Sequence, residues 1–313
     1  MPNRPHSAPE EVAAAPVDTW PCVRAAQARE PAARIGFCIA DVPVGSVARE
    51  HVDRVKALAS PGTLAHQPAG DGLAERLVWC TPAPQRDAEL ARLNAALRDA
   101  GVLVGWRDEP FAVVAQAQAD SARACTAAPL AVIERAAARF WGTLTFGAHA
   151  NGHLADAAGR PTHLWLGRRA LSKATDPGRL DNLVGGGVPW RQSPAEALLR
   201  EAWEEAGLPP DLAQQARPVR VLRLHRDLPE GLQHEHLHAF DLRLPPDWRP
   251  QNQDGEVAGF DCLPMDAALA QAASGAMTVD AALVTLDFAL RHRLLPAAEH
   301  ARLAQALRPL VVA

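Results

Sequence analysis

Short apolar runs surround one amphipathic segment in the first third of the chain. Leu90, Leu93 and Leu97 recur at helical spacing within residues 85–100, and Gly101 follows as a stop signal. Apolar runs of strand length occur at residues 35–40, 77–80, 102–106 and 111–114. This mixture predicts an α+β N-terminal domain over residues 21–118, preceded by a Pro-rich flexible tail over residues 1–20.

The rest of the chain predicts a larger second unit. The polar, Ala-rich stretch 116–126 is typical of a linker, and residues 130–141 have a helical pattern. Two runs that flank an Ala-Ala-Gly-Arg turn predict a β-hairpin. The predicted elements are the hairpin strands 149–154 and 162–167, strands 180–187, 219–225 and 236–242, and helices 267–273, 279–290 and 298–307. We therefore expect one domain over residues 126–275, with C-terminal helices over 276–313 that pack on it.

Composition excludes several classes of protein. The 313 residues carry a net charge of −4, which argues against nucleic-acid binding through bulk positive charge. No uninterrupted apolar run is long enough for a membrane helix, and the N-terminus lacks the apolar core of a secretory signal. The five cysteines are widely spaced, without a Cys-x-x-Cys pair, as expected of reduced thiols. These features predict a cytoplasmic protein, whose oligomeric state the pattern leaves open.

One helix is marked by local chemistry at both of its ends. Ser193 is a good N-cap, Pro194 suits the first helical position, and Glu196 completes a capping box. Gly207 is placed to end the helix in a left-handed conformation. The glycines 185–187 precede this helix at the end of a predicted strand.

Three glutamates lie on one face of this helix. Glu201, Glu204 and Glu205 are related by steps of three and four residues, so their side chains are neighbours. Three carboxylates on one face repel one another unless a cation lies among them, and oxygen ligands of this kind suit Mg²⁺ or Mn²⁺. A three-acid face alone is most often a solvated surface, but the glycine strand end and the caps favour a metal site here.

The segment resembles the Nudix box, G-x5-E-x7-R-E-U-x-E-E-x-G-U, where U is apolar. Gly186 opens the pattern, and Arg200 with Glu201 forms its R-E pair. Glu204 and Glu205 form its E-E pair, and Gly207 with Leu208 closes it. One position departs, because Gln192 stands where the pattern has its first glutamate, which in the family mainly braces the loop.

Further motifs resemble one branch of the family, the one related to the Nudix part of fungal thiamine pyrophosphokinase. They are Phe146–Gly152, Leu164–Arg169, Lys173–Asn182 and Asp254–Phe260. The resemblance implies a Nudix α/β/α sandwich with a mixed sheet and a helical C-terminus, preceded by the extra α+β domain. It also implies Mg²⁺-dependent hydrolysis of a diphosphate linkage in a small molecule, with thiamine diphosphate or its oxidised and damaged analogues as the substrate class.

Candidate roles follow from the resemblance and the side-chain chemistry. Glu201, Glu204 and Glu205 are the expected metal ligands and catalytic residues, and Glu256 in Asp-Gly-Glu-Val is the best candidate for a further ligand or general base. The expected substrate-binding residues are Arg168, Arg169, Lys173 and Glu235. Surface charge is the competing interpretation for each of these cations.

The histidines 234, 236 and 238 suggest a metal site that the spacing does not support. On a strand they share one face while Glu235 points the other way, and the motif is not His-Glu-x-x-His. A structural role is also the default for His149, Asn151 and most tryptophans, although Trp190 in the loop of the box could stack on a substrate ring.

Three hypotheses for the function remain open at this point. The first is a hydrolase of thiamine diphosphate or a similar compound, and the second is a Nudix hydrolase of ADP-ribose or NADH. The third is a Nudix-fold binding module without catalysis, which only Gln192 favours.

Overall fold

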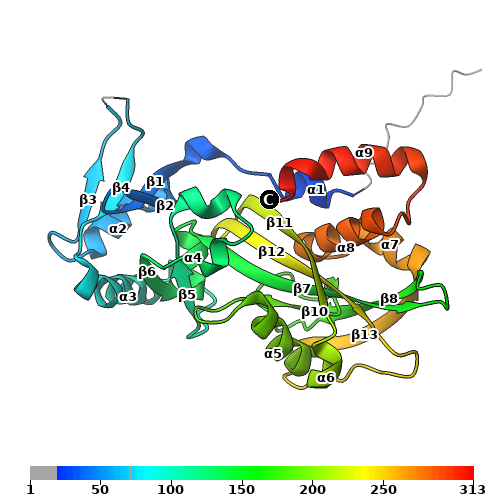
Figure 1. Ribbon diagram of the computed structural model, residues 1–313. Coiled ribbons are helices and arrows are strands. Elements are labelled where there is room, and N and C mark those ends of the chain that lie inside the picture. The colour runs from blue at the N-terminus through cyan, green and yellow to red at the C-terminus, as the bar shows by residue number, and fades with distance from the viewer. Residues whose placement is uncertain (1–19, 71) are drawn as a thin grey trace, which may run out of the picture.

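The computed structural model describes residues 20–70 and 72–313 (Figure 1). The predicted tail at 1–20 therefore lies outside the described residues except for Trp20. Within the described ranges, no helix combines the length and the apolar composition that crossing a bilayer requires.

A four-stranded sheet forms the body of the N-terminal region. Its strands are β1 (Arg34–Ile39), β2 (Val42–Ala48), β3 (Leu64–Gln67) and β4 (Arg76–Trp79), in the order β2-β1-β4-β3. The helices α2 (Val52–Leu58) and α3 (Ala83–Asp99) bury their apolar residues against this sheet, including the predicted trio Leu90, Leu93 and Leu97. The predicted α+β character of this region is confirmed.

Residues 102–106, predicted as a strand, form a loop instead. Gly101 adopts a φ of +71°, and the backbone N–H groups of Val102 and Leu103 donate to the Leu97 carbonyl. Leu103 is buried, so the apolar pattern here serves to close the C-terminal end of α3 rather than to build a sheet.

The segment 130–141, predicted as one helix, is divided between a strand and a helix. Strand β5 (Pro110–Val113) pairs with β6 (Ala131–Glu134), and α4 (Arg135–Phe140) follows directly. Glu134 separates the two elements because its carboxylate accepts a hydrogen bond from the Ala136 N–H and caps the helix.

The stretch predicted as a linker is packed. It forms two short 3₁₀ helices, η3 (Gln116–Asp120) and η4 (Ala124–Thr126), and it buries Ala119 and Ala124 against the core of the larger sheet. Residues on both sides of it, including Phe111 and Trp141, belong to the core of the N-terminal sheet.

A mixed seven-stranded sheet forms the centre of the second unit. Its strands are β7 (Leu144–Ala155), β8 (Pro161–Arg169), β9 (Leu180–Asn182), β10 (Val184–Gly187), β11 (Arg217–Leu228), β12 (Gly231–Arg243) and β13 (Val257–Pro264). The main order is β11-β12-β7-β8-β13, with β10 paired to β7 and β9 paired to β8. Strands β12 and β7 run parallel, whereas the other pairs are antiparallel.

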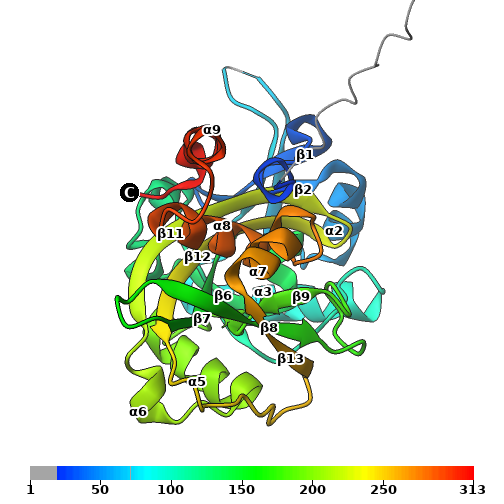
Figure 2. The same ribbon diagram turned by 90° about the vertical axis from the view of Figure 1, so that its right-hand side faces the viewer.

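Helices cover both faces of this sheet (Figures 1 and 2). On one face lie α5 (Pro194–Ala206) and α6 (Pro210–Ala213). On the other lie α7 (Met265–Ala273) and α8 (Val279–Arg291), with α9 (Ala297–Leu307) and the 3₁₀ turn η5 (Arg308–Leu310) beyond them. The predicted α/β/α sandwich with a helical C-terminus is confirmed.

The first described residues pack on the C-terminal helices rather than on the N-terminal sheet. The Trp20 N–H donates to the Ala273 carbonyl, its indole Nε1 lies 3.3 Å from a Glu299 oxygen, and α1 (Cys22–Ala25) follows beside α8. The 3₁₀ turns η1 (Pro31–Ala33) and η2 (Arg49–His51) flank the strands β1 and β2 that follow. Residues 20–26 therefore pack with the helical layer, and the Ala26 and Ala28 carbonyls accept from strand β11, whereas a domain boundary at residue 21 predicts packing on the N-terminal sheet.

Substitution of Trp141 tests how much this residue contributes to the stability of the N-terminal core. It is fully buried, its ring stacks on Phe37 at 4.4 Å, and its Nε1 donates to Asn94 Oδ1 at 2.8 Å. We expect Trp141→Ala to lower the free energy of unfolding by about 3–5 kcal/mol. Trp203→Ala, at a tryptophan that is 52% exposed, is the matched control and should change it by about 0.5 kcal/mol or less. Urea denaturation of both variants measures the difference, and equal effects would contradict this account of the core.

Candidate active site

Helix α5 has the ends that the sequence predicts. The Glu196 N–H donates to Ser193 Oγ, and the Glu196 carboxylate accepts from the Ser193 N–H at 2.8 Å, which completes the capping box. Gly207 ends the helix in the left-handed region with a φ of +61°. These caps fix where the helix begins and ends, and therefore which residues face the sheet.

The three glycines of β10 each make room for a different side chain. A Cβ on Gly185 would lie 2.8 Å from the His149 ring, and one on Gly186 would lie 2.2 Å from the Glu201 carboxyl group. A Cβ on Gly187 would lie 2.9 Å from the Phe111 ring and 3.3 Å from the guanidinium carbon of Arg135. The glycine run thus lets helix α5 and the N-terminal region approach the strand closely.

Glu201 and Glu205 are buried together against this strand. Their relative exposures are 8% and 6%, and the Gly185 N–H donates to Glu205 Oε2 at 2.9 Å. Burial and the nearby Glu201 charge raise the pKa of Glu205 well above its ordinary value. Burial also raises the pKa of Glu201, and the cations of Arg200 and Arg135 only partly oppose this. The chain therefore buries two like charges without enough positive charge to balance them.

Glu204 does not join this pair. Its carboxylate accepts from Arg200 Nη1 at 2.8 Å, and its side chain is 39% exposed. Arg200 Nη2 also lies 2.9 Å from Glu201 Oε1. The contact with Gln192 is longer and weaker, since Arg200 Nε lies 3.5 Å from Gln192 Oε1. Arg200 thus bridges the carboxylates of Glu201 and Glu204, and Glu204 is the more exposed of the two.

The buried pair fits a hard divalent cation. Mg²⁺ is usually held by one or two carboxylates, with substrate phosphates and water as its other ligands. Two carboxylates that are both raised in pKa, one accepting a backbone N–H, form a donor set of this kind. Among residues 20–70 and 72–313, no three His, Cys, Asp or Glu side chains converge as a complete cage. The expected cluster of three glutamates is therefore a pair in this structure.

A cavity of about 430 Å³ opens beside the glycine strand. Lys173, Arg169, Asp181, Glu235 and Glu256 line it from the large sheet and its loops, together with the glycines 185–187. Glu201 and Glu205 do not themselves line the cavity, since they lie against the glycines of its wall. The cavity and the buried pair nevertheless interact electrostatically, because the positive charge of Lys173 in the cavity wall favours the ionised form of Glu205.

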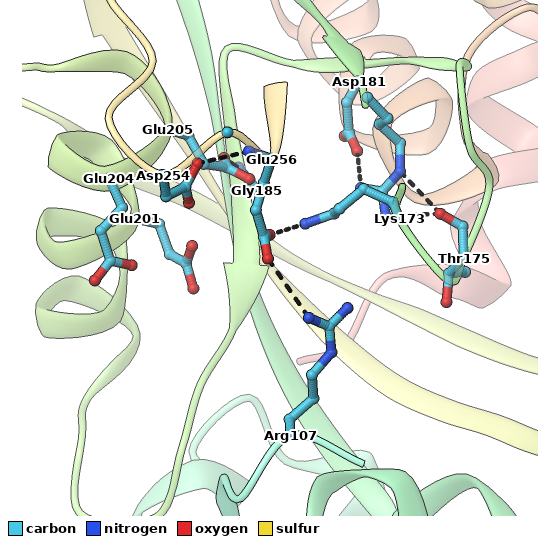
Figure 3. Close-up of polar contacts among 12 residues, drawn as sticks. Arg107, Lys173, Thr175, Asp181, Gly185, Glu201, Glu204, Glu205, Asp254 and Glu256 are labelled. Carbon is cyan, nitrogen blue, oxygen red and sulfur yellow. Dashed lines mark hydrogen bonds and ion pairs between the residues drawn. The ribbon is translucent and has the colours of Figure 1, made fainter. Parts of the chain in front are cut away.

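The predicted substrate-binding cations occupy different positions, and Figure 3 shows that of Lys173. Lys173 lines the cavity and pairs with Glu256. Arg169 also lines it, but its guanidinium donates to the Thr175 carbonyl and to Asp181 at 2.8 Å, so it holds the loop between β8 and β9. Arg168 points elsewhere: it lies outside the residues that line the cavity and contacts Asp261 and the Gly178 carbonyl.

Glu256 and Glu235 both face the cavity. Burial opposes ionisation of Glu256, but Lys173 and Arg107 outweigh it and hold the pKa of Glu256 below its ordinary value. Glu235 accepts from Gln233 Nε2 at 2.7 Å, and the same amide donates to Asp280 at 3.0 Å. Gln233 thereby holds two carboxylates side by side in the cavity wall.

The histidines of β12 lie away from this cavity. His225 stacks on His234 at 4.2 Å, and both line a separate hollow beside Arg34. Burial lowers the pKa of His234 to about 3 and that of His236 to about 4, so both rings are neutral at pH 7. His149 does line the cavity, with its Nδ1 3.0 Å from Asn182 Oδ1.

Three cationic residues of the cavity are not predicted from the sequence. Arg107, Arg135 and Arg139 line it from the N-terminal region, by which we mean the four-stranded sheet and the segments up to α4 that share its core. Arg107 lies in the charged turn before β5, and the other two lie in α4. No local pattern marks them, because what brings them to the cavity is the pairing of β5 with β6 and the packing of this unit on the glycine strand.

The buried pair makes a prediction about stability. Because the folded-state pKa of Glu205 is raised, its protonated form is favoured in the folded chain, and stability is lost as pH rises toward that pKa. In metal-free buffer at pH 7, Glu205→Gln should therefore raise the melting temperature, and the gain should shrink at acid pH.

Glu196→Gln in the same helix is the matched control, and its melting temperature should change in the opposite direction. Its backbone and hydroxyl contacts with Ser193 lower the pKa of Glu196, so its charge stabilises the fold above the ordinary carboxyl pKa. Calorimetry should show a lower melting temperature for this variant at pH 7. A fall for both variants would contradict the charge imbalance at Glu205.

Comparison with known proteins agrees with the geometry. Residues 149–282 match the NUDIX domain family. Two curated relatives from Arabidopsis thaliana are "Nudix hydrolase 24, chloroplastic", 34% identical over 213 residues, and "Nudix hydrolase 20, chloroplastic", 35% identical over 214 residues. These alignments cover 67% and 66% of this chain but 55% and 53% of the relatives, so the chain spans about half their length.

A solved structure of the MutT protein from Methanosarcina mazei is 18% identical, with a TM-score of 0.36, and covers 48% of this chain and 96% of its own. The expected resemblance to the Nudix family is thereby confirmed by the family match and the curated relatives. Residues 149–282 form a Nudix domain, and the chain is a relative of the Nudix hydrolases.

Proposed function

We propose that this chain is a Mg²⁺-dependent hydrolase that cleaves a diphosphate linkage in a small molecule. The observation that carries the proposal is the pair Glu201 and Glu205, buried against the glycine strand beside a cavity lined by both basic and acidic side chains. A buried anionic pair next to a polar cavity of about 430 Å³ fits a metal ion and a phosphorylated ligand. The kinship with Nudix hydrolases supports the same reaction class.

Glu201 and Glu205 would hold the ion, with Glu204 outside the ligand set. When bound, Mg²⁺ would neutralise charge on the phosphate oxygens and lower the pKa of bound water. Arg200 positions the helix face by pairing with Glu201 and Glu204. A third carboxylate, that of Glu109, lies 3.8 Å from Arg200 Nη2.

Glu256 is the residue that we assign as general base. It lines the cavity, it is 35% exposed at the side chain, and Lys173 and Arg107 keep it ionised. An ionised carboxylate in this position can accept the proton of an attacking water. Lys173, which pairs with it, is placed to contact a phosphate oxygen from the same side.

We further propose thiamine diphosphate, or an oxidised or damaged analogue, as the substrate, with the monophosphate and phosphate as products. The sequence motifs around residues 146–182 and 254–260 support this class through their resemblance to the thiamine pyrophosphokinase branch. The acidic part of the cavity supports it independently, because Glu235 and Asp280 fit a cationic or amine-bearing ring. ADP-ribose and NADH also carry an amine-bearing ring, adenine, but neither has a cationic ring of the thiazolium type.

Substitution of the ligand pair tests the reaction. We expect Glu205→Gln to lower kcat for phosphate release by about 10³-fold, because the loss of one ligand charge removes the stabilisation of the transition state. Glu256→Gln should lower kcat by about 10²-fold, as expected for a general base. The control is Glu196→Gln on the outer face of the same helix, which should retain activity. Unchanged release of phosphate by Glu205→Gln at saturating Mg²⁺ would refute the mechanism.

A substrate panel tests the specificity. Mass spectrometry of the products from thiamine diphosphate, oxythiamine diphosphate and ADP-ribose with Mg²⁺ should show the highest kcat/KM for the first two. Glu235→Gln should lower kcat/KM for thiamine diphosphate about tenfold while that for ADP-ribose stays unchanged. Preferred cleavage of ADP-ribose would instead favour a nucleotide hydrolase, and binding without turnover under any divalent ion would favour a binding module.

A further inference from the structure

Part of the N-terminal region forms one wall of the cavity. Val104, Gly105 and Arg107 line it from the loop after α3, and Arg135 and Arg139 line it from α4. The glycine strand and Glu256 line the same cavity from the Nudix domain. Figure 3 shows Arg107 reaching toward Glu256 from the N-terminal side.

A hydrogen bond joins the two regions at this wall. The Trp190 N–H, in the loop before α5, donates to the Pro110 carbonyl at 2.8 Å. Within the N-terminal region, the Arg135 N–H donates to the Glu109 carbonyl at 2.9 Å. The loop that carries Arg107 is also fixed, since the Arg107 N–H donates to Glu134 Oε1 at 2.7 Å and Trp106 Nε1 donates to Asp108.

Glu109 lies between two arginines. Its carboxylate accepts from Arg135 Nη1 at 2.8 Å and lies 3.8 Å from Arg200 Nη2. Its side chain is 19% exposed. One N-terminal carboxylate therefore orients both a cation of the cavity wall and the arginine that pairs with Glu201.

Arg135 has unused hydrogen-bonding capacity beside the glycine strand. Its guanidinium carbon would lie 3.3 Å from a Cβ on Gly187, so it sits directly against the end of β10. The hydrogen bond described for its side chain uses Nη1, and the guanidinium has further N–H groups on Nη2 and Nε. Its side chain is 42% exposed, toward the cavity that it lines.

The other cations of the cavity are already engaged among the described residues. Arg169 is held by Asp181 and the Thr175 carbonyl, Lys173 by Glu256, and Arg139 by Glu230. Arg107 makes a looser contact, 3.5 Å from Glu256, and its side chain is 41% exposed. Arg135 is paired with Glu109 much as Arg139 is with Glu230, but Arg107 and Arg135 are the most exposed cations of the cavity, at 41% and 42% against 27% for Arg139. They are therefore the cations best placed to take an anionic ligand.

We propose that Arg107 and Arg135 bind the diphosphate group of the substrate, with Glu109 as a positioning residue, so that the N-terminal region completes the Nudix site. The planar fork of arginine matches pairs of phosphate oxygens. This inference rests on the proposed function, because it places a diphosphate in the cavity beside Glu201 and Glu205.

Binding of methylenediphosphonate with Mg²⁺ tests this directly, because its P–C–P bridge cannot be hydrolysed. Isothermal titration calorimetry should show that Arg107→Gln and Arg135→Gln each weaken binding about tenfold or more, since each removes a charge-assisted hydrogen bond. Arg135→Lys keeps the charge without the fork and should weaken binding less. The matched control is Arg92→Gln, an arginine that pairs with Glu89 on α3 and is 46% exposed. Circular dichroism and melting temperatures check that each variant is folded.

Glu109→Gln separates positioning from direct contact. In the wild-type background it should weaken binding of methylenediphosphonate, and in the Arg135→Gln background the same change should have a smaller effect. Equal effects in both backgrounds would overturn the positioning role of Glu109.

The outcomes separate this inference from the proposed function. Wild-type affinity in folded Arg107→Gln and Arg135→Gln, or no binding by the wild-type chain, would overturn the inference even if the chain hydrolyses diphosphates. Weakened binding in these two variants and not in Arg92→Gln would support it. If that pattern appeared without hydrolysis of any diphosphate, the binding site would stand and the proposed hydrolase would not.

Discussion

The burial of two carboxylates against a strand of glycines is the constraint on which the rest of the structure depends. Glu201 and Glu205 lie one helical turn apart, and both pack against β10 where side chains are absent. Two like charges in a medium of low polarity repel strongly, so the ionised pair is unfavourable in the folded chain without a cation. A fold that keeps this arrangement accepts a cost in stability that a bound ion would offset.

Charge balance explains how the surrounding elements are placed. On α5, Arg200 forms ion pairs with Glu204 and Glu201, which offset the negative charge of Glu204 and part of that of Glu201. On the cavity side, Lys173 and Arg107 pair with Glu256, and Arg135 lies against Gly187. Glu109 connects the two sides, because it contacts both Arg135 and Arg200.

Local features of the site could be predicted from the sequence, and features that depend on distant contacts could not. The capping box at Ser193, the left-handed Gly207 and the glycine run are local, and each is found as expected. The spacing of the acids predicted a shared face, and the four-residue step from Arg200 to Glu204 also predicted their ion pair. The spacing did not predict how deeply each carboxylate would be buried, because that depends on the packing of α5 against β10.

Dependence on distant contacts also explains why the predicted and observed elements differ elsewhere in the fold. Residues 131–134 form a short apolar run that includes Val132 and Ile133 and that suits either a helix or a strand by pattern alone, and they are extended because β5 offers a partner. Arg168 and Arg169 are adjacent in the sequence, yet alternation along β8 sends only Arg169 toward the cavity. Arg107 and Arg135 reach the site through packing between regions that are distant in the sequence.

The most direct test of the account is a crystal structure of the wild-type chain with Mn²⁺ and methylenediphosphonate, with anomalous diffraction used to locate the metal. The account predicts an anomalous peak coordinated by the carboxylates of Glu201 and Glu205 and by phosphonate oxygens. A peak elsewhere, or a bound phosphonate with no metal at these two glutamates, would contradict the account.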